Sequence, residues 1–416
     1  MMQQKTKPEL LAPAKNLERL KTAIQYGADA VYVGGQRYGL RARADNLTGE
    51  ELTKAVAFAH KRDACVYLTM NAFLHDEDFE GFEDYCHFLE EIELDAVIVS
   101  DLGVLRRVKQ CSNLPIHLST QASCLNSYGA RLWKQLGVER LIVGRELSVA
   151  EGGSVAGKAD VDVEMFVHGA MCMAFSGHCT ISNFTAGRDS NRGGCSQSCR
   201  FAYQIDGEPK LETTKAAHYR SQADSASAVP YMSSMDMAGI AQVPLFFQHG
   251  ICSLKIEGRM KSSLYVATTC RVYRRLIDAY AEGNWSDALV QEAQQELLSV
   301  PHRTYFAGSL ETPADSESVF SQAYGNNTGT HSLLGKVLDV GSERITVQLH
   351  APLKKGDVLE FLPFQSSALP LKIDTMFTVL GEPRESMRQD SVVCLPLAQN
   401  LSAVEADNVV RLAGSA

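Results

Sequence analysis

Four cysteines whose types and spacing could support metal chemistry lie in one short stretch: Cys172, Cys179, Cys195 and Cys199, in the pattern C-x6-C-x15-C-x3-C. Thiols this close in sequence can form disulfides, bind zinc or hold an iron–sulfur cluster. Zinc sites favour close cysteine pairs, and only Cys195 and Cys199 meet that spacing. Iron–sulfur clusters accept wider and irregular spacing because their iron corners are well separated. The spacing therefore favours an iron–sulfur cluster, with zinc and unligated reactive thiols as alternatives.

The composition indicates the cellular compartment in which these thiols are found. The chain has 416 residues, 45% hydrophobic and 21% charged, with a net charge of −9, which is typical of a soluble globular protein. Its first residues show no signal-peptide pattern, and no run approaches the roughly 20 apolar residues of a membrane span. We therefore expect a cytoplasmic protein, in which disulfides are disfavoured. The acidity argues against an unselective polyanion binder but not against a local basic patch.

One unit repeats along most of the chain before residue 300: a short β-branched apolar run, a turn, and a segment with helical periodicity. Apolar strands that alternate with amphipathic helices indicate a parallel sheet covered on both faces. Eight such units predict a (β/α)8 TIM-like barrel, with helices that include 17–27, 49–62 and 82–92. An open doubly wound sheet is disfavoured because APAKNL, not a glycine-rich turn, follows the first strand. The predicted strands are 9–14, 30–35, 65–70, 96–100, 116–120, 140–144, 163–169 and 253–258.

We expect the barrel domain to span residues 1–308, with a cysteine-bearing insertion at 171–250. Within the insertion, RFAYQIDG and YMSSMD could pair as a hairpin, and the polar segment 211–229 between them is interpreted as a mobile loop. YMSSMD is also a possible ninth strand. A polar linker is expected at 309–331, followed at 332–416 by short strands that predict a small antiparallel β-barrel. Such a module binds a partner or braces the main domain.

Active sites of (β/α)8 barrels lie at the carboxyl ends of the strands. Cys172 comes three residues after the seventh predicted strand, so the cysteines should lie on this face. Arg145 and Glu146 follow the sixth strand there. Several polar residues at or near strand ends are each a candidate substrate contact or a satisfied core group: Asn71, His117, Gln121 and His168.

Two further groups of charged residues could bind an anionic substrate. Arg37, Arg41 and Arg43 form a basic loop after the second strand, either a solvated charge run or a contact to phosphates or a carboxylate. Lys255 and Glu257 are alternate residues of the eighth strand, so both should point inward, as a structural ion pair or as part of a substrate grip with Arg259. The candidate catalytic residues are Glu146, His168, Lys255 and Glu257, and the candidate substrate-binding residues are Arg41, Asn71, His117, Gln121, Arg145 and Arg259.

The run EMFVHGAMCMAFSGHCTIS, from Glu164 to Ser182, resembles position by position the signature of peptidase family U32, the collagenase-like peptidases. The likeness extends to ELLAPAKNLERLKTAIQYGADAVYVGG near the start, VGRELS at 143–148 and SLKIEGRMKS at 253–262. Within that family the chain is most similar to the prephenate-dependent tRNA uridine hydroxylases.

This resemblance implies a cofactor, two partners and a reaction. Hydroxylating members of the family hold a [4Fe–4S] cluster on four cysteines, which would here be Cys172, Cys179, Cys195 and Cys199. The implied reaction adds a hydroxyl group to C5 of the wobble uridine of tRNA. Prephenate or a derived metabolite would be required, and molecular oxygen would not be the oxygen source. Prephenate is a dicarboxylate, so two or three basic groups at one rim would fit it.

Two other functions stay open. A peptidase is the first, although the sequence has no HExxH helix, GxSxG elbow or papain-type cysteine motif. A zinc-stabilised RNA-binding scaffold is the second, although basic and aromatic motifs do not interleave in the sequence.

Overall fold

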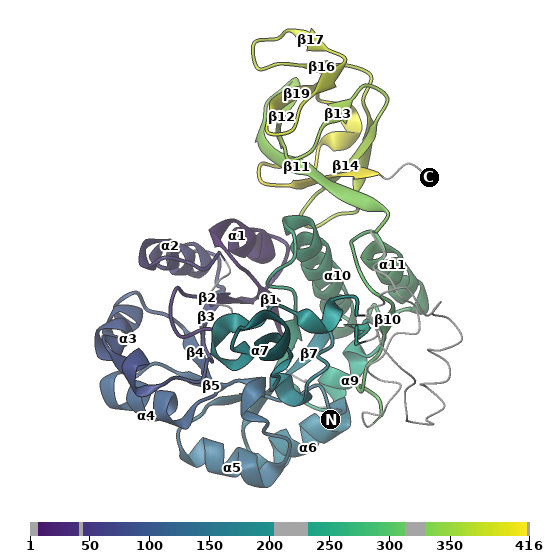
Figure 1. The fold of residues 1–416 in the computed structure, drawn as a ribbon. Helices are drawn as coiled ribbons and strands as arrows, with labels where there is room; N and C mark the ends of the chain where they lie inside the picture. Colours follow the sequence, from purple (N-terminus) through teal and green to yellow (C-terminus); the bar gives the residue numbers. More distant parts are fainter. Residues whose placement is uncertain (1–6, 41–44, 204–231, 313–328, 414–416) are drawn as a thin grey trace.

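Eight parallel strands close into a barrel (Figure 1). The structure, a computed structural model, describes residues 7–40, 45–203, 232–312 and 329–413. Successive strands pair in chain order, and β9 closes the sheet by pairing with both β7 and β1. The predicted barrel is confirmed, with strands β1 (Glu9–Pro13), β2 (Ala30–Gly34), β3 (Cys65–Met70), β4 (Ala96–Val99), β5 (Ile116–Leu118), β6 (Arg140–Ile142), β7 (Asp162–Ala170) and β9 (Ser253–Ile256).

Helices surround the barrel between successive strands (Figure 1). The first helix begins after Asn16, whose side-chain oxygen accepts a hydrogen bond from Arg19 N at 3.1 Å. The chain leaves this helix through Gly27 at φ +100°, a left-handed conformation that favours glycine, so the predicted helix stop is confirmed. The helices are α1 (Leu17–Gln25), α2 (Gly49–His60), α3 (Phe82–Glu91), α4 (Leu102–Cys111), α5 (Ser127–Gln135), α6 (Val149–Ala159), α7 (Ile181–Ala186), α9 (Val243–Gln248), α10 (Ser263–Ala281) and α11 (Asp287–Leu297).

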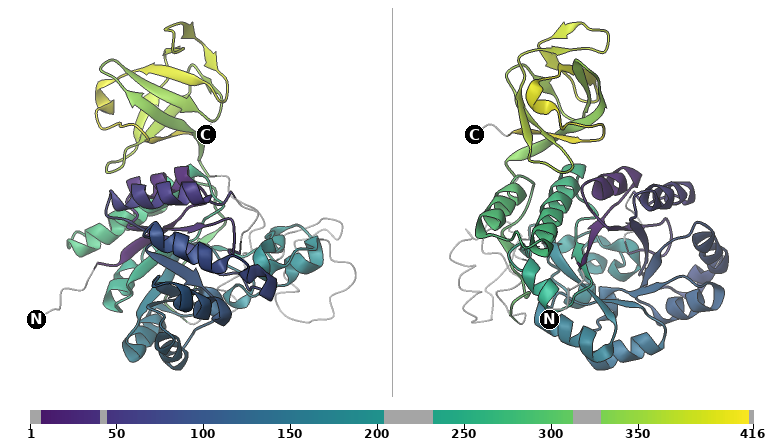
Figure 2. Two further views of the ribbon diagram at one scale, coloured as in Figure 1. Left: turned by 90° about the vertical axis from the view of Figure 1, so that its left-hand side faces the viewer. Right: turned by 180° about the vertical axis from the view of Figure 1, so that it is seen from behind.

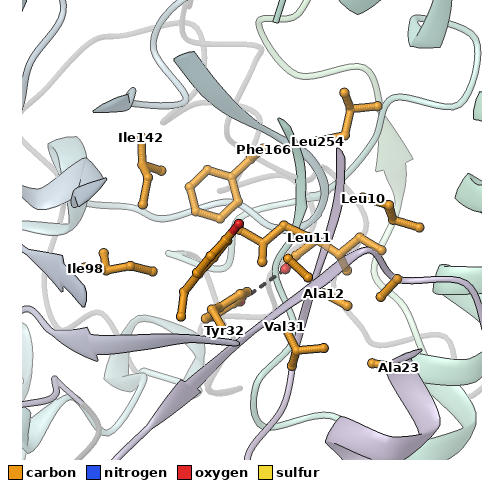
Figure 3. Close-up of a cluster of buried hydrophobic side chains, with 14 of the residues drawn as sticks. Leu10, Leu11, Ala12, Ala23, Val31, Tyr32, Ile98, Ile142, Phe166 and Leu254 are labelled. Carbon is orange, nitrogen blue, oxygen red and sulfur yellow. Dashed lines mark hydrogen bonds between the residues drawn. The ribbon is translucent and has the colours of Figure 1, made fainter. Parts of the chain in front are cut away.

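Side chains of the strands alternate between the barrel interior and the helix layer. Tyr32, Ile98 and Phe166 meet inside the barrel, whereas Val31 faces Ala23 of α1 (Figure 3). All five side chains are buried. The interior is therefore a packed core, and a substrate can bind only at one of its ends.

A short strand lies outside the barrel. β8 (Asp236–Ala238) pairs antiparallel with the end of β7 and parallel with β10 (Tyr305–Phe306). It begins at the last residue of YMSSMD, so the possible ninth strand exists but does not enter the barrel. Residues 204–231, which contain the second half of RFAYQIDG and the whole predicted mobile loop, lie outside the described residues, so the predicted hairpin stays a prediction.

Residues 329–413 form an antiparallel module with a core of its own, as predicted (Figure 2). Its main sheet has the order β15-β14-β20-β11-β12-β19-β16-β17, and the described pairings end at β15 and β17, so the sheet is a curled half-barrel. The run KIDTMFTVL at 372–380, one of the short strands expected in this module, is interrupted, because Ile373 hydrogen-bonds instead with Gly356 and Asp357. The strands are β11 (His331–Val340), β12 (Arg344–Leu349), β13 (Leu353–Lys354), β14 (Val358–Leu362), β15 (Leu369–Lys372), β16 (Met376–Phe377), β17 (Pro383–Arg384), β18 (Ser386–Met387), β19 (Val392–Pro396) and β20 (Val409–Ala413).

The module docks on the helix layer of the barrel through buried polar contacts. The Tyr26 hydroxyl donates to the carbonyl oxygen of Leu362 at 2.5 Å and accepts from Val409 N at 2.8 Å. Arg411 Nη1 donates to Glu296 Oε1 at 2.8 Å. These contacts hold the module against the barrel. The domain boundaries at 308 and 331 stay predictions, because residues 313–328 lie outside the described ranges. No helix in the described part is long and apolar enough to cross a membrane.

Candidate active site

Residues 172–203, here called the cysteine segment, cover the end of the barrel at which β7 ends (Figures 1 and 2). Cys172 comes two residues after the end of β7. The segment contains α7 and the short turns η3 (Phe175–Gly177), η4 (Ser190–Gly194) and η5 (Ser198–Arg200). The cysteines thus lie on the face at which barrels of this type hold their active sites.

The four thiols are unpaired and share one neighbourhood. Burial raises the pKa of the Cys199 thiol, and Cys172, Cys195 and Cys179 all add to that rise. Burial likewise raises the pKa of Cys172, with Cys179 and Cys195 again adding to it. Thiolates so arranged would repel one another, so the group favours a bound cationic centre.

The arrangement of the four thiols can be compared with what a zinc ion and an iron–sulfur cluster each require. In the part of the chain that the structure describes, no three His, Cys, Asp or Glu side chains are placed to hold a single metal ion. One zinc ion needs its ligands within about 2.0–2.3 Å, whereas an iron–sulfur cluster takes its thiolates at separate irons. Ile181 N donates to Cys179 Sγ at 3.3 Å, and the Ala174 backbone bonds to the Cys172 sulfur. Hydrogen bonds to sulfur are also found at iron–sulfur clusters, and an all-thiol donor set suits such a cluster.

Glu146, a predicted catalytic residue, anchors the loop between Cys172 and Cys179. Its Oε1 accepts a hydrogen bond from Ser176 N at 2.8 Å. Its Oε2 is buried with no hydrogen-bond partner among the described residues. Gly144 permits this approach, because a Cβ there would lie 2.1 Å from Oε2. Ser176 has a φ of +47°, so Glu146 secures a strained backbone conformation.

Two further contacts tie the cysteine segment to the barrel. His178 Nε2 hydrogen-bonds to the carbonyl oxygen of Gln121. Phe73 N donates to the carbonyl oxygen of Asn191 at 3.1 Å. The rings of Phe73 and His178 also pack edge to face, with centroids 5.7 Å apart. His178, although next to Cys179, therefore contacts the barrel.

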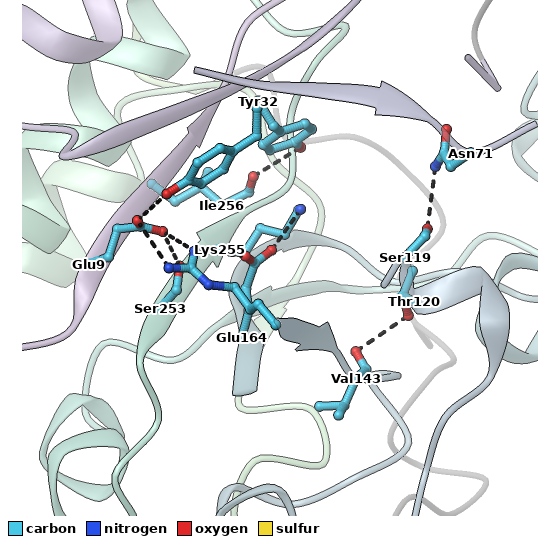
Figure 4. Close-up of polar contacts among 12 residues, drawn as sticks. Glu9, Tyr32, Asn71, Ser119, Thr120, Val143, Glu164, Ser253, Lys255 and Ile256 are labelled. Carbon is cyan, nitrogen blue, oxygen red and sulfur yellow. Dashed lines mark hydrogen bonds and ion pairs between the residues drawn. The ribbon is translucent and has the colours of Figure 1, made fainter. Parts of the chain in front are cut away.

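Asn71 and Gln121, two predicted substrate-binding residues, form an amide pair at the barrel mouth. Asn71 Nδ2 donates to Gln121 Oε1 at 3.2 Å. It also donates to Ser119 Oγ at 3.4 Å (Figure 4). Leu40 N donates to Asn71 Oδ1 at 3.4 Å. Because Gln121 also holds His178, the amide pair lies next to the cysteine segment.

Two predicted substrate-binding arginines, Arg145 and Arg259, follow the carboxyl ends of β6 and β9. The Arg145 guanidinium lies 3.7 Å from the centroid of the Phe166 ring, and its charge opposes the rise of the Cys172 pKa, which places it near the thiols. Arg259 donates to Thr69 Oγ1 at 3.1 Å. Arg41, with Arg43, lies outside the described residues. Arg37, from the same predicted basic loop, donates to the carbonyl oxygen of Glu80 at 2.6 Å.

Lys255 belongs to a buried charge network deeper in the barrel, toward the amino ends of the strands, here called the floor network (Figure 4). Lys255 Nζ donates to Glu164 Oε1 at 2.8 Å. Arg140 Nη1 lies 3.5 Å from Glu164 Oε2 and 2.7 Å from Glu9 Oε1. Lys255 is therefore ion-paired with Glu164. The expected pairing of Lys255 with Glu257 is wrong, because the carboxylate that Lys255 contacts belongs to Glu164 on β7. Glu257 follows the last residue of β9.

His117, another predicted substrate contact, is buried next to the floor network. Burial lowers its pKa well below the ordinary value, and the charges of Arg140 and Lys255 lower it further. Its ring packs edge to face against Tyr67 at 4.7 Å between centroids. His117 is consequently neutral at physiological pH.

His168, a predicted catalytic residue, faces the helix layer. The pairing of β7 with β9 shifts register between Phe166 and His168, so the strict alternation of side chains breaks there. His168 Nδ1 lies 3.2 Å from the Tyr273 hydroxyl, and its ring also packs against Tyr265. Burial lowers its pKa to about 3. The structure thus places a neutral histidine between β7 and α10 and does not bring it into the barrel mouth.

Glu257, the remaining predicted catalytic residue, lies in a polar cluster next to the cysteine segment. Burial lowers the pKa values of Arg200 and Lys261, and the charges of Glu257 and Asp236 oppose that effect. Glu257 thus belongs with the cations near Cys199 and not with Lys255.

Sequence reasoning missed the partners of the floor network. Glu164 comes two residues before Phe166 on β7, so the two-residue period of the strand would have placed both inside the barrel. Glu9 and Arg140 are the first residues of their strands, where a charge usually meets solvent. For them the sequence offered no usable signal.

The described pockets differ in size and place. A pocket of about 260 Å³ lies between the loops after β2 and β3 and Arg192 of the cysteine segment. A larger pocket of about 740 Å³ is lined by residues at the carboxyl ends of α5 and α6, including Gly137 and Asp160. These helix ends precede the next strands, so the larger pocket opens at the end of the barrel away from the thiols. Pocket size is therefore no guide to the reactive end.

The fold and the cysteine segment together define a family. The model of peptidase family U32 matches residues 15–319, and the chain belongs to this family. The resemblance carried by EMFVHGAMCMAFSGHCTIS is thereby confirmed.

Three similar proteins have informative names. The chain is 40% identical to "tRNA hydroxylation protein P1" of Bacillus subtilis (strain 168), over 92% of this chain and 90% of that protein. It is 30% identical to "23S rRNA 5-hydroxycytidine C2501 synthase" of Escherichia coli (strain K12), over 85% of this chain and 52% of that protein. It is also 30% identical to "Collagenase" of Porphyromonas gingivalis (strain ATCC BAA-308 / W83), over 72% of each.

Proposed function

We propose that this protein is an enzyme that hydroxylates C5 of the wobble uridine of tRNA, forming 5-hydroxyuridine. The observation that carries the proposal is the group of four thiols on the face where (β/α)8 barrels hold their reaction centres. The B. subtilis relative, named for tRNA hydroxylation, matches nearly the whole chain. The E. coli relative is named for 5-hydroxylation of a pyrimidine in another RNA. Both names support hydroxylation of an RNA base.

The proposed cofactor is a [4Fe–4S] cluster with Cys172, Cys179, Cys195 and Cys199 as ligands. All four proposed donors are thiols, which is the ligand type of such clusters, and two of the sulfurs accept backbone hydrogen bonds. With every iron ligated by protein, such a cluster would supply electron transfer or structural support. The protein's part is to hold the thiols in place, which Glu146 does through Ser176 N.

The proposed hydroxyl donor is prephenate or a metabolite derived from it. Its carboxylates would be bound by Arg145 and Arg259, since a guanidinium group suits a carboxylate. No carboxylate in the described part of the chain is hydrogen-bonded to the Arg145 guanidinium, which lies on the Phe166 ring. The reaction exchanges the donor hydroxyl for the C5 hydrogen of uracil, so atoms and electrons balance without molecular oxygen.

The amide pair of Asn71 and Gln121 would orient the base. Uracil presents carbonyl acceptors and one N–H donor on its edge, and amide side chains offer both kinds of group. Bases in RNA loops are recognised through such edges. The pair lies next to the cysteine segment because Gln121 also contacts His178.

A peptidase is the alternative that the P. gingivalis relative suggests by name. A cysteine peptidase needs a base within hydrogen-bond reach of its nucleophile. Among the described residues, no histidine hydrogen-bonds to one of the four thiols: His178 bonds to a carbonyl oxygen, and His168 lies near Tyr273. The geometry therefore favours hydroxylation.

Nucleoside mass spectrometry of tRNA from a deletion strain tests the proposal. We expect 5-hydroxyuridine and its derivatives to disappear and to return with the wild-type gene. Protein purified without oxygen should be brown and contain about four iron and four sulfide per chain. Unchanged 5-hydroxyuridine in a strain without a second pathway would overturn the function. One equivalent of zinc without iron would overturn the cofactor.

A further inference from the structure

Exposed aromatic side chains are concentrated in the cysteine segment. Phe175, Phe184 and Phe201 are 58%, 94% and 47% exposed. The other phenylalanines that the structure describes are buried or half-buried. Single exposed apolar residues are ordinary, but a group of them in one segment indicates a binding surface.

Another exposed aromatic lies at the same end of the barrel. Tyr128, 79% exposed, is in the first turn of α5, which follows the carboxyl end of β5. The Arg131 guanidinium lies 5.5 Å from the centroid of its ring. Met260, 49% exposed, follows the carboxyl end of β9. Tyr128 and Met260 thus expose apolar side chains at the same end of the barrel as the cysteine segment.

The charge of the cysteine segment differs from that of the whole chain. Residues 172–203 contain three arginines, Arg188, Arg192 and Arg200, and one acidic residue, Asp189, so their net charge is 3 − 1 = +2. The whole chain carries −9. Arg192 is ion-paired with Asp78 at 3.0 Å, so Arg188 and Arg200 are the cations of the segment that can complement a polyanion. Aromatic rings with nearby arginines match single-stranded nucleic acid, whose bases stack on the rings while cations hold the phosphates.

We infer that Phe175, Phe184, Phe201 and Tyr128, here called the aromatic collar, stack unpaired bases of the anticodon loop of tRNA. The inference rests on the proposed function and adds how the substrate is held. A loop can present splayed bases to aromatic side chains, whereas bases inside a duplex are already stacked. The collar lies at the same end of the barrel as the thiols, so a loop bound there brings a base toward the reactive end.

The test is a binding measurement on the full-length protein, purified without oxygen. Fluorescence anisotropy would follow a labelled anticodon stem–loop RNA and a labelled duplex of the same length. Phe184 is chosen because its near-complete exposure makes substitutions harmless to folding. Phe184→Ala should weaken stem–loop binding roughly 5- to 150-fold, the range seen when a stacked ring is removed. Duplex binding should change far less.

Matched variants separate ring stacking from other contacts. Phe184→Tyr should bind the stem–loop within about threefold of wild type, and Phe184→Leu should be as weak as Phe184→Ala, because stacking needs a ring. Leu380→Ala removes another large apolar side chain, 84% exposed but on the C-terminal module, and should bind normally.

Three results would overturn the inference. The first is equal stem–loop affinity of Phe184→Ala and wild type. The second is normal binding by Phe184→Leu, which would indicate a general apolar contact. The third is a wild-type dimer that Phe184→Ala dissociates without loss of RNA affinity, which would assign the collar to a contact between copies. If wild-type protein hydroxylates tRNA in these cases, the proposed function stands; absence of 5-hydroxyuridine formation by wild type is the separate failure of that function.

Discussion

The two ends of the barrel satisfy their polar groups to different degrees. In the floor network, Lys255 and Arg140 contact Glu164, and Arg140 also contacts Glu9. Arg140 Nε and the neighbouring His117 Nδ1 lack a hydrogen-bond partner among the described residues. At the rim, the buried polar atoms that lack hydrogen-bond partners within the described ranges include Glu146 Oε2, Ser176 Oγ, Ser190 Oγ and Arg192 Nη1. Buried polar groups are normally satisfied, so such exceptions indicate an absent partner or a functional site. The floor therefore supports the fold, and the rim is built to bind.

The largest effect is expected when a rim thiol is removed. Cys172→Ser should abolish iron binding and hydroxylation because serine is a poor replacement for a soft thiolate ligand. The barrel should remain folded, since the floor network and core are untouched. Iron and sulfide content, nucleoside mass spectrometry and circular dichroism measure the three properties. Cys111→Ser, at the half-buried end of α4, is the matched control and should keep both iron and activity.

A Cys172→Ser protein that retained iron and activity would contradict the ligand assignment. One that unfolded would contradict the division between the two ends of the barrel, because the rim would then carry stability as well.

The next largest effect is expected at the floor. Glu164→Ala leaves Lys255 and Arg140 buried beside each other without their shared carboxylate, and should cost about 3–5 kcal/mol of unfolding free energy. Urea denaturation measures this loss. Glu50→Ala breaks an exposed ion pair with Lys54 and should leave stability unchanged. Similar stability of the two variants would show that the floor network is not a structural element.

Much of the fold could be predicted because its signals are local. Apolar runs and helical periodicity located the eight strands, and Gly27 marked the end of α1. The curled shape of the C-terminal sheet could not be predicted, because it depends on which distant strands pair. Ile373, for example, bonds to a turn at 356–357 and interrupts a strand that its own sequence favours.

The site was less predictable because orientation and pairing are not local. Strict alternation could not anticipate the register shift after Phe166, which turns His168 toward α10. Lys255 finds its partner on another strand, at Glu164. The position of the cysteines could be anticipated, because the residue after a barrel strand lies at its carboxyl end.

A moderate effect is expected at the contact that joins barrel and rim. Glu146→Ala removes the acceptor of Ser176 N and should lower hydroxylation about 10- to 100-fold, as loss of a residue that orients ligands usually does. Glu146→Gln keeps an oxygen acceptor and should recover most of the activity. Iron occupancy and rate measurements on both variants check this. If Gln is as poor as Ala while iron binding is normal, the carboxylate takes part in the chemistry and does not merely position the loop.

At neutral pH the smallest effect is expected at His168, whose protonation makes stability depend on pH only in acid. Its folded pKa of about 3 lies below the ordinary value of 6.5, chiefly through burial, although Asp236 and Glu257 oppose the shift. Above pH 6.5 both folded and unfolded states are neutral at this site, so it makes no pH-dependent contribution. Between pH 6.5 and about 3 only the unfolded state takes up the proton. Stability should therefore fall with decreasing pH by about 1.4 kcal/mol per pH unit from this group.

His168→Gln retains hydrogen-bonding capacity without titrating, so its urea midpoints between pH 4 and 6 should decline less steeply than those of wild type. The carboxylates and His117 titrate in both proteins, and the difference between the two slopes isolates His168. Identical slopes would mean that His168 takes up a proton in the folded state near its ordinary pKa. It would then be accessible to solvent and able to serve as an acid or base at the rim, and the packed layer between β7 and α10 would belong to the reactive end of the barrel.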